Sequence, residues 1–218
     1  MHVINLENVY ADLMKNGKWV GFGEVPDGPV DHSLPILHIS VNGKTTALLV
    51  NYACHCTTLG GKFNQIHGDW AGRAAELIEA NHPGANAMIA IGCGADANPK
   101  ARGEFESIEP HAQSLATEVE RLLTTQLKPI STAPKTQLQR IALPFDPMPK
   151  APEWQALVDS NSSFSYYAKK ILARLAEGKA ISKSLPYPIQ TWTFGDELAM
   201  VFLAGEVVVD YSHRLKEI

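Results

Sequence analysis

The sequence has few cysteines and no long apolar run. Its three cysteines, Cys54, Cys56 and Cys93, cannot make a complete disulfide framework, so free thiols are expected. The longest apolar segments, near residues 47–53 and 198–204, have the length of buried strands. Because a helix needs roughly 18 apolar residues to cross a bilayer, we expect no transmembrane segment. The N-terminus also lacks the basic and apolar regions of a signal peptide.

An excess of positive charge is also absent. The net charge is −4 with a pI near 6.1, and the nearest basic cluster, Lys169, Lys170 and Arg174, has the spacing of a solvated helix face. No nucleic-acid partner is therefore expected. Hydrophobic residues make up 45% and charged residues 19% of the 218 positions, a balance that favours a packed core over disorder.

Several catalytic motifs are missing. The sequence contains no Gly-x-Ser-x-Gly nucleophile elbow, no Gly-Lys-Ser/Thr phosphate loop and no Gly-x-Gly-x-x-Gly turn after a strand. It also lacks a His-Glu-x-x-His helix. The chemistries that depend on these motifs are therefore poorly supported.

The start of the chain predicts a hairpin after an irregular lead-in. Residues 1–33 are weakly patterned, and we expect a short helix followed by a long loop there. Strands are predicted at 34–41 and 45–53. Asn42 and Gly43 between them are the strongest short hairpin signal.

A helix and a buried strand are predicted next. The helix runs from 70 to 81, with Asp69 as its N-cap, and the sequence His-Pro-Gly at 82–84 ends it. Residues 87–91 form a short apolar strand, and 92–99 are expected to be a loop.

The second half predicts a further helix and a second hairpin. A helix that begins near Pro110 carries the i, i+4, i+7, i+8 stripe Leu115, Val119, Leu122, Leu123. The remaining expected elements are a strand at 136–143, helices at 154–158 and 166–175, hairpin strands at 189–194 and 198–203, and a final helix at 207–217. The fold class is therefore α/β, a mixed sheet with helices packed on it and hairpins at both ends.

Three predicted strands end in loops that carry polar residues. The exits follow Ala53, Ile91 and Leu203, and they meet at one edge if the strands share a sheet and a direction. The polar groups delivered there would be His55, Asp96, Asn98 and Glu206, with His67 and Asp69 nearby. A neutral imidazole can be a metal ligand or a general base, and zinc accepts imidazole and carboxylate ligands.

Each of these residues also has a structural interpretation. His55 could be a hydrogen-bonded core histidine, and His67 a polar loop residue. Asp69 could be only a helix cap, and Asp96 and Asn98 turn residues before a proline. Glu206 could be favoured there by the helix dipole. A Cys-His-Cys cluster at 54–56 is disfavoured because adjacent strand residues point to opposite faces.

Four segments in a fixed order carry a family resemblance. They read NYACHCTTLG at 51–60, IHGDWAG at 66–72, GCGADANP at 92–99 and LAGEV at 203–207. In order and spacing they resemble the N-terminal catalytic domain of the neutral/alkaline non-lysosomal ceramidase family, in its broad bacterial branch. The resemblance runs from about residue 34 to the C-terminus.

The resemblance implies a zinc-dependent amidase that splits an N-acyl bond, as in ceramide, by metal-activated water. It implies that His55 and Glu206 are zinc ligands, and that Asp69 and the loop with Asp96 and Asn98 shape the site around the metal. We expect His67 or Asp69 to orient the water or to donate to the oxyanion.

The family's other two zinc ligands, a histidine further upstream and a tyrosine further downstream, have no matching position. The resemblance therefore implies a single partial catalytic domain at 1–218, with 1–33 as a lead-in and 34–218 as the family-like region. Flanking segments of the same domain and a small-molecule or lipid amide are the expected partners. The chain alone is expected to be inactive, and the family implies an extracellular or periplasmic location.

Two other functions stay open. One is a non-catalytic α/β module with an incomplete metal site that binds a ligand or a partner. The other is a different metal hydrolase on the same scaffold, acting on a non-lipid amide or ester.

Overall fold

The computed structural model describes residues 7–15, 18–160 and 162–218, with side chains from residue 23 onward. Two compact units are present, one formed by the chain up to residue 129 together with 205–218, and the other by 130–204. Strands and helices alternate, and the described residues form three three-stranded sheets and five α-helices. The predicted α/β class is confirmed.

A mixed sheet is the centre of the first unit. Its strand order is β3 (Ile36–Val41), β4 (Lys44–Tyr52), β5 (Asn86–Ile91), with β3 and β4 antiparallel and β4 and β5 parallel. The predicted hairpin turn is confirmed, because Asn42 and Gly43 have φ values of 53° and 76°. Two positive φ angles in a two-residue loop match the twist of the flanking strands.

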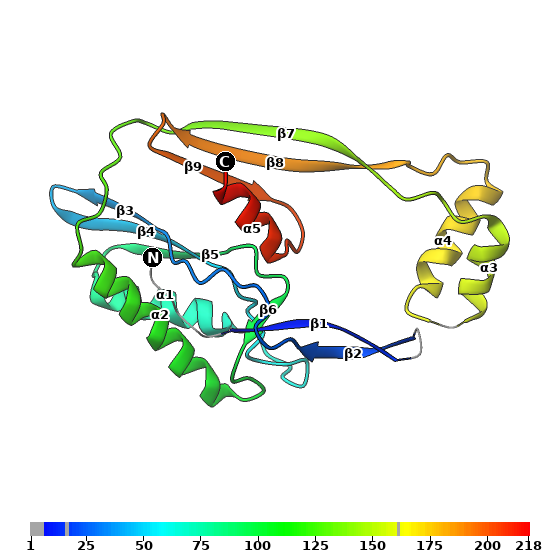
Figure 1. The fold of residues 1–218 in the computed structure, drawn as a ribbon, viewed down its shortest axis with the longest axis horizontal. Helices are drawn as coiled ribbons and strands as arrows, with labels where there is room; N and C mark the ends of the chain where they lie inside the picture. Colours follow the sequence, from blue (N-terminus) through cyan, green and yellow to red (C-terminus); the bar gives the residue numbers. More distant parts are fainter. Residues whose placement is uncertain (1–6, 16–17, 161) are drawn as a thin grey trace. The chain divides into compact units, whose positions relative to one another are not determined.

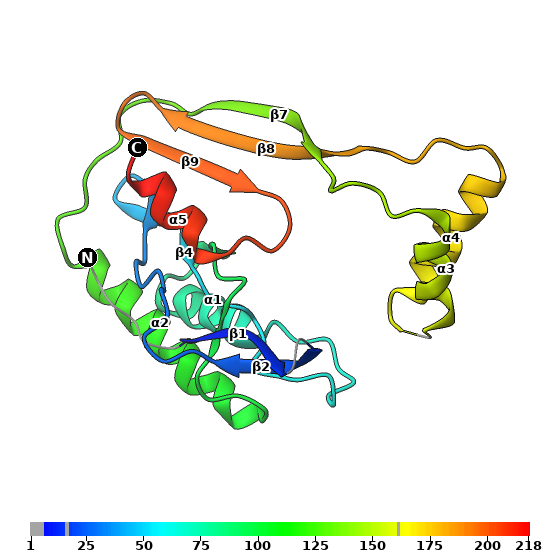
Figure 2. The same cartoon turned by 45° about the vertical axis from the view of Figure 1, so that its right-hand side comes forward.

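Two helices, α1 (Asp69–Asn81) and α2 (Ile108–Leu123), lie side by side and pack on this sheet (Figures 1 and 2). Alternate residues of β4 point toward them, and α2 presents the stripe expected from its sequence. The buried cluster joins residues from all three elements, among them Leu48, Val50, Tyr52, Trp70, Ile78, Leu115 and Val119. This core fixes the ends of β4 and β5, from which the candidate site is built.

The prediction for the N-terminal segment is wrong. Instead of a helix and a loop, β1 (Glu7–Lys15) and β2 (Lys18–Glu24) form an antiparallel pair. A short strand, β6 (Ala97–Pro99), pairs with β1 and lies inside the segment that was expected to be a loop. The β-favouring Val, Tyr, Trp and Phe of β1 and β2 support this pairing, which overrides the weak periodicity of the N-terminal segment.

The start of α1 also differs from the prediction. The helix begins at Asp69 itself, Gly68 holds the N-cap position, and no side chain caps the helix there. Asp69 has a φ of 54°, so it stands at a sharp change of chain direction. Its carboxylate accepts from backbone N–H groups on both sides of this change of direction, as the contacts below show.

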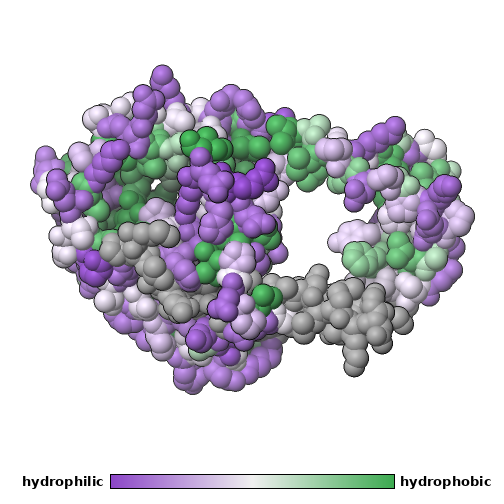
Figure 3. Space-filling model, in the orientation of Figure 1, coloured by the Kyte–Doolittle hydropathy of each residue, from purple (hydrophilic) through white to green (hydrophobic). Residues whose placement is uncertain are grey.

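The second unit is an antiparallel sheet and a helical pair. Its strands are β7 (Lys135–Pro144), β8 (Ser184–Phe194) and β9 (Leu198–Leu203), and its helices are α3 (Ala151–Asp159) and α4 (Ser165–Ala176). The predicted second hairpin, β8–β9, is confirmed. Apolar residues along β7 and β8 are exposed, as Figure 3 shows, and they include Leu138, Ile141, Leu143 and Leu185.

The C-terminal helix is shorter than expected. It is α5 (Val209–Lys216), it belongs to the first unit, and it is preceded by a turn in which Gly205 has a φ of 78°. Glu206 therefore lies in this turn and not in the first turn of the helix.

Candidate functional site

Two of the three predicted strand exits lie side by side. β4 and β5 run parallel, with Tyr52 beside Ile91 at their ends. The glycine at position 94 lets the second exit loop lie directly on the first, since a Cβ atom there would stand 2.4 Å from the carbonyl carbon of Ala53. The third exit does not share this sheet, because β9 pairs with β8 in the antiparallel sheet of the second unit. The residues after it, from Gly205, rejoin the first unit.

His55 is held firmly in the first exit loop. Its Nε2 lies 2.9 Å from the carbonyl oxygen of Ala95, and its backbone N–H donates to the carbonyl of Ala97 at 2.9 Å. Its own carbonyl accepts from the indole N–H of Trp70 at 2.9 Å. Trp70 is buried and packs edge-on against Tyr52, so the His55 backbone is tied to the core.

The contact with Ala95 fixes the tautomer of this ring. A carbonyl oxygen can only accept a hydrogen bond, so Nε2 of His55 carries the proton. The neutral ring then keeps its lone pair on Nδ1. A histidine ligand commonly donates its second ring nitrogen to a carbonyl in this way, which leaves the other nitrogen for a metal.

Ala95 also contacts the segment that carries Glu206. The backbone N–H of Ala95 donates to the carbonyl of Val207 at 3.2 Å. One carboxylate oxygen of Asp96 accepts from the N–H of Val209 at 3.1 Å, which is the first N–H of α5. A single residue, Ala95, therefore contacts the His55 ring on one side and the neighbour of Glu206 on the other. Glu206 itself is exposed.

Asp69 organises the loop that follows His55. Its buried carboxylate accepts from the backbone N–H groups of Thr58 at 3.2 Å, Leu59 at 2.9 Å and Trp70 at 2.7 Å. Two of these three donors belong to the loop and one to the helix. The side chain therefore ties the His55 loop to the start of α1.

His67 and Asn98 are also engaged by neighbouring groups. The backbone N–H of Asp69 donates to Nδ1 of His67 at 2.9 Å, so the neutral ring carries its proton on Nε2. His67 is exposed and its ring stands edge-on to Phe105. The side-chain oxygen of Asn98 accepts from the Thr57 hydroxyl at 2.7 Å.

The cysteines beside His55 do not join it in a cluster. Cys54 is buried and Cys56 is exposed. Desolvation of the sulfur atom, with a smaller effect of the Asp69 charge, raises the pKa of the Cys56 thiol to about 11. Metals bind the thiolate form, so this thiol is a poor ligand at neutral pH.

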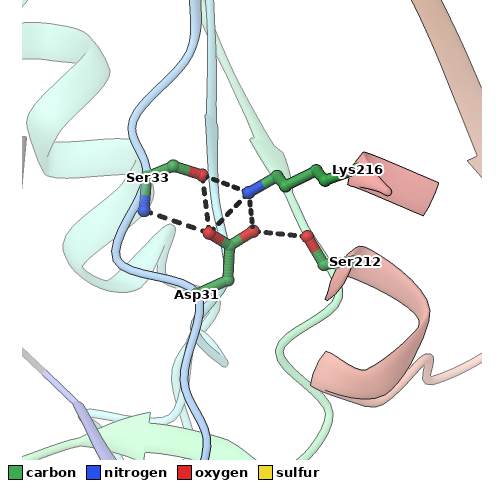
Figure 4. Close-up of polar contacts among 4 residues, drawn as sticks. All are labelled: Asp31, Ser33, Ser212 and Lys216. Carbon is green, nitrogen blue, oxygen red and sulfur yellow. Dashed lines mark hydrogen bonds and ion pairs between the residues drawn. The ribbon is translucent and has the colours of Figure 1, made fainter. Parts of the chain in front are cut away.

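A charged cluster around the buried Asp31 carboxylate was not predicted from the sequence (Figure 4). The Asp31 carboxylate accepts from the Lys216 ammonium at 2.6 Å to each oxygen, from the Ser212 hydroxyl, and from the N–H and hydroxyl of Ser33. Burial alone would raise the pKa of Asp31, but the bonds from Lys216, Ser212 and Ser33 outweigh it and lower the pKa to about 2. Burial raises the pKa of the Cys93 thiol, and the charge of Asp31 raises it further.

This cluster has no base strong enough to activate Ser33, because the Asp31 carboxylate that accepts from the Ser33 hydroxyl has a pKa of about 2. The Lys216 ammonium uses its three donors on the two Asp31 oxygens and the Ser33 hydroxyl, the last at 2.6 Å. It has no lone pair to activate Ser33. The arrangement of Ser33, Asp31 and Lys216 therefore holds chain segments together and is no nucleophile–base pair.

Metal-binding capacity within the described residues is limited. No group of three or more His, Cys, Asp or Glu side chains stands close enough to hold a metal ion in the part of the chain that the structure describes. His55 and Glu206 have suitable donor chemistry for zinc, but they supply two ligands at most, whereas catalytic zinc sites use three from the protein. Their ligand roles remain predictions.

The helices of the described residues are all too short or too polar to cross a membrane.

The comparisons with known proteins identify similar structures but no similar sequences. No protein-family model and no curated protein matches the chain. Two solved structures resemble it: neutral ceramidase from Pseudomonas aeruginosa, with a TM-score of 0.60 and 15% identity, and a ceramidase complexed with C2, with 0.61 and 13%. They are matched over 86% and 88% of this chain, but over only 36% and 40% of their own length. The chain therefore has a ceramidase-like fold and spans well under half of these neighbours.

Proposed function

We propose that this chain carries part of the active site of a zinc-dependent amidohydrolase that cleaves an N-acyl amide bond. The observation that best supports the proposal is the position of Ala95, which hydrogen-bonds both the His55 ring and the residue that follows Glu206. The ceramidase-like fold is consistent with it.

His55 and Glu206 are the residues that would hold the metal. The Nδ1 lone pair of His55 is available because Nε2 donates to Ala95. The exposed Glu206 carboxylate follows Gly205, and the contacts of Val207 and Val209 hold its segment. Further ligands would come from flanking segments of the same domain. Zinc bound there would polarise an amide carbonyl and lower the pKa of a water molecule.

The other residues of the site have supporting roles in this proposal. His67 presents an N–H at Nε2 on an exposed ring, which suits donation to the oxyanion that forms when an amide is attacked. Asp69, Asp96 and Asn98 orient the loops through hydrogen bonds. Asp69 accepts from Thr58 and Leu59, Asp96 accepts from Val209, and Asn98 accepts from Thr57. A ceramide-like lipid amide is the proposed substrate, and an extracellular or periplasmic location the proposed setting.

Hydrolysis of a fluorescent N-acyl sphingosine by the protein with its natural flanking sequence tests the proposal. His55→Ala and Glu206→Gln are each expected to lower kcat/KM by more than about 100-fold, since even the partners of metal ligands are worth 10–100-fold. His38→Ala is the matched control, because His38 bonds Thr45 across the β3–β4 hairpin, and its activity should not change. Dialysis against a chelator should abolish hydrolysis and zinc should restore it. A metal-free protein that still cleaves the amide contradicts the proposal.

A non-catalytic module with an incomplete metal site is the second candidate. It is favoured by the absence of a three-donor group among the described side chains. Stoichiometric zinc in the protein with its flanking sequence, together with hydrolysis, would exclude this candidate.

A further inference from the structure

The helix α5 is attached to the first unit mainly by polar contacts. It has only eight residues, of which only Val209 and Ser212 are buried, and Tyr211 and Leu215 on it are exposed. An isolated helix of this length is not stable in water, and it has too little apolar burial to compensate. Its position must therefore depend on the specific hydrogen bonds and ion pairs that it makes.

These contacts occur at both ends of the helix. At the N-terminal end, Ala95 and Asp96 bond Val207 and Val209. Toward the C-terminal end, Ser212 and Lys216 lie one turn apart on the same face, and both donate to the buried Asp31 carboxylate (Figure 4).

The segment held at the start of the helix is the one that carries Glu206. Only two residues separate Glu206 from Val209, and Gly205 before it is in the left-handed region, so the turn has little rigidity of its own. A change in the docking of α5 is thus transmitted directly to the Glu206 carboxylate.

We infer that Asp31 is a positioning residue of the site: by holding Ser212 and Lys216, it fixes α5 and with it the Glu206 segment beside the His55 loop. The role of Glu206 as a zinc ligand rests on the proposed function, whereas the placement of its segment by Asp31 does not.

Removal of the Asp31 charge tests the inference in the folded protein. Asp31→Asn and Lys216→Met should each speed amide hydrogen exchange in residues 205–216 by about 10- to 100-fold, the range for loss of hydrogen bonds to a charged group. Exchange in α1 and α2 should stay unchanged. The matched controls are Glu109→Gln and Lys62→Met, which break exposed ion pairs with Arg73 and Glu104 and should leave residues 205–216 protected.

A zinc chloride titration followed by NMR separates positioning from a general loss of stability. In the wild type, signals of both Glu206 and His55 should shift. In Asp31→Asn the zinc-induced shift of the backbone signals of the Glu206 segment should fall to the level measured for the same signals in Glu206→Ala. The shift at His55 should remain. Lys216→Arg keeps a donor to Asp31 and should retain both shifts.

The possible outcomes are distinct. If the wild type with its flanking sequence binds no zinc but residues 205–216 still exchange faster in Asp31→Asn, the proposed function fails and the placement by Asp31 stands. If folded Asp31→Asn and Lys216→Met keep these amides protected, the inference is overturned. If Asp31→Asn does not fold, Lys216→Met and Ser212→Ala decide the matter by the same exchange measurement.

Discussion

Asp69 satisfies three backbone N–H groups with one buried carboxylate, and two of them belong to the loop after His55. Asp69→Asn keeps one acceptor oxygen and replaces the other with a donor that faces Thr58 or Leu59. We expect a loss of about 1–3 kcal/mol in the free energy of unfolding, the cost of an unsatisfied buried group. Urea denaturation measures it.

The matched control is Asp27→Asn. Asp27 has a φ of 60°, close to the 54° of Asp69, but it is exposed, so the substitution tests the backbone conformation without the buried contacts. Equal stability of Asp69→Asn and the wild type would contradict the role given to this carboxylate.

Gly94 allows the two exit loops to touch. A Cβ atom at this position would stand 2.4 Å from the Ala53 carbonyl carbon and 2.5 Å from the Cys54 nitrogen, and both are backbone atoms that cannot rotate away. Gly94→Ala should therefore destabilise the protein by more than about 2 kcal/mol, in the range of overpacked sites. Gly61→Ala, whose Cβ would meet nothing within 4 Å, should leave the stability close to that of the wild type. Thermal denaturation measures both variants. Equal melting temperatures for the two variants would show that the loops can separate at little cost.

The residue types of the site could be predicted from the sequence, but their partners could not. The glycines, histidines and acids at the strand exits were identified from pattern and resemblance. The backbone carbonyl of Ala95 and the amides of Thr58 and Leu59 carry no side-chain signal, and they decide the tautomer of His55 and the role of Asp69. Asp31 was missed because its partners, Ser212 and Lys216, are about 180 positions away in the chain.

At the scale of elements, the attachment of α5 predicts a specific response to acid. The folded-state pKa of Asp31, about 2, lies below its ordinary value of 3.8, so its contribution is complete above the ordinary value and is lost as pH falls through about 2. The contribution amounts to about 2 kcal/mol, at 1.36 kcal/mol for each pKa unit. The wild type should therefore lose about this much more stability than Asp31→Asn over that pH interval. Parallel pH profiles of unfolding for the two proteins would contradict this account.

Elements with local signals were predicted well, and elements that depend on distant partners were not. The turn at Asn42 and Gly43, the apolar face of α2 and the β8–β9 hairpin are encoded within a few residues of one another. The β1–β6 pairing was missed because β6 is a three-residue strand about 90 positions after β1. The condition that β9 shares a sheet with β4 is not met, because its hairpin partner β8 takes it into the second unit.

At the scale of the whole molecule, the fold corresponds to part of much longer solved structures. The chain matches the ceramidase structures over most of its own length but over 36% and 40% of theirs. The two proposed zinc donors, His55 and Glu206, both lie in the first unit. We therefore expect that the chain alone binds zinc more weakly than micromolar, since catalytic sites use three protein ligands.

The sequence predicted the fold class because strand and helix periodicity are local properties. It did not predict the division into two units, because the chain leaves the first unit near residue 129 and returns to it at residue 205, and such a return has no signal in the sequence. The return of the chain to the first unit at Gly205 brings Val207 to Ala95, and only the structure reveals that contact.

The central claim is that His55 and Glu206 serve one metal ion. An NMR titration of the 218-residue chain with zinc, following the imidazole nitrogens of His55 and the side-chain carbonyl carbon of Glu206, tests it most directly. We predict that both groups shift together along a single weak binding curve, and that His55→Ala abolishes the shift at Glu206. A shift at one group alone, or at neither, would contradict the claim.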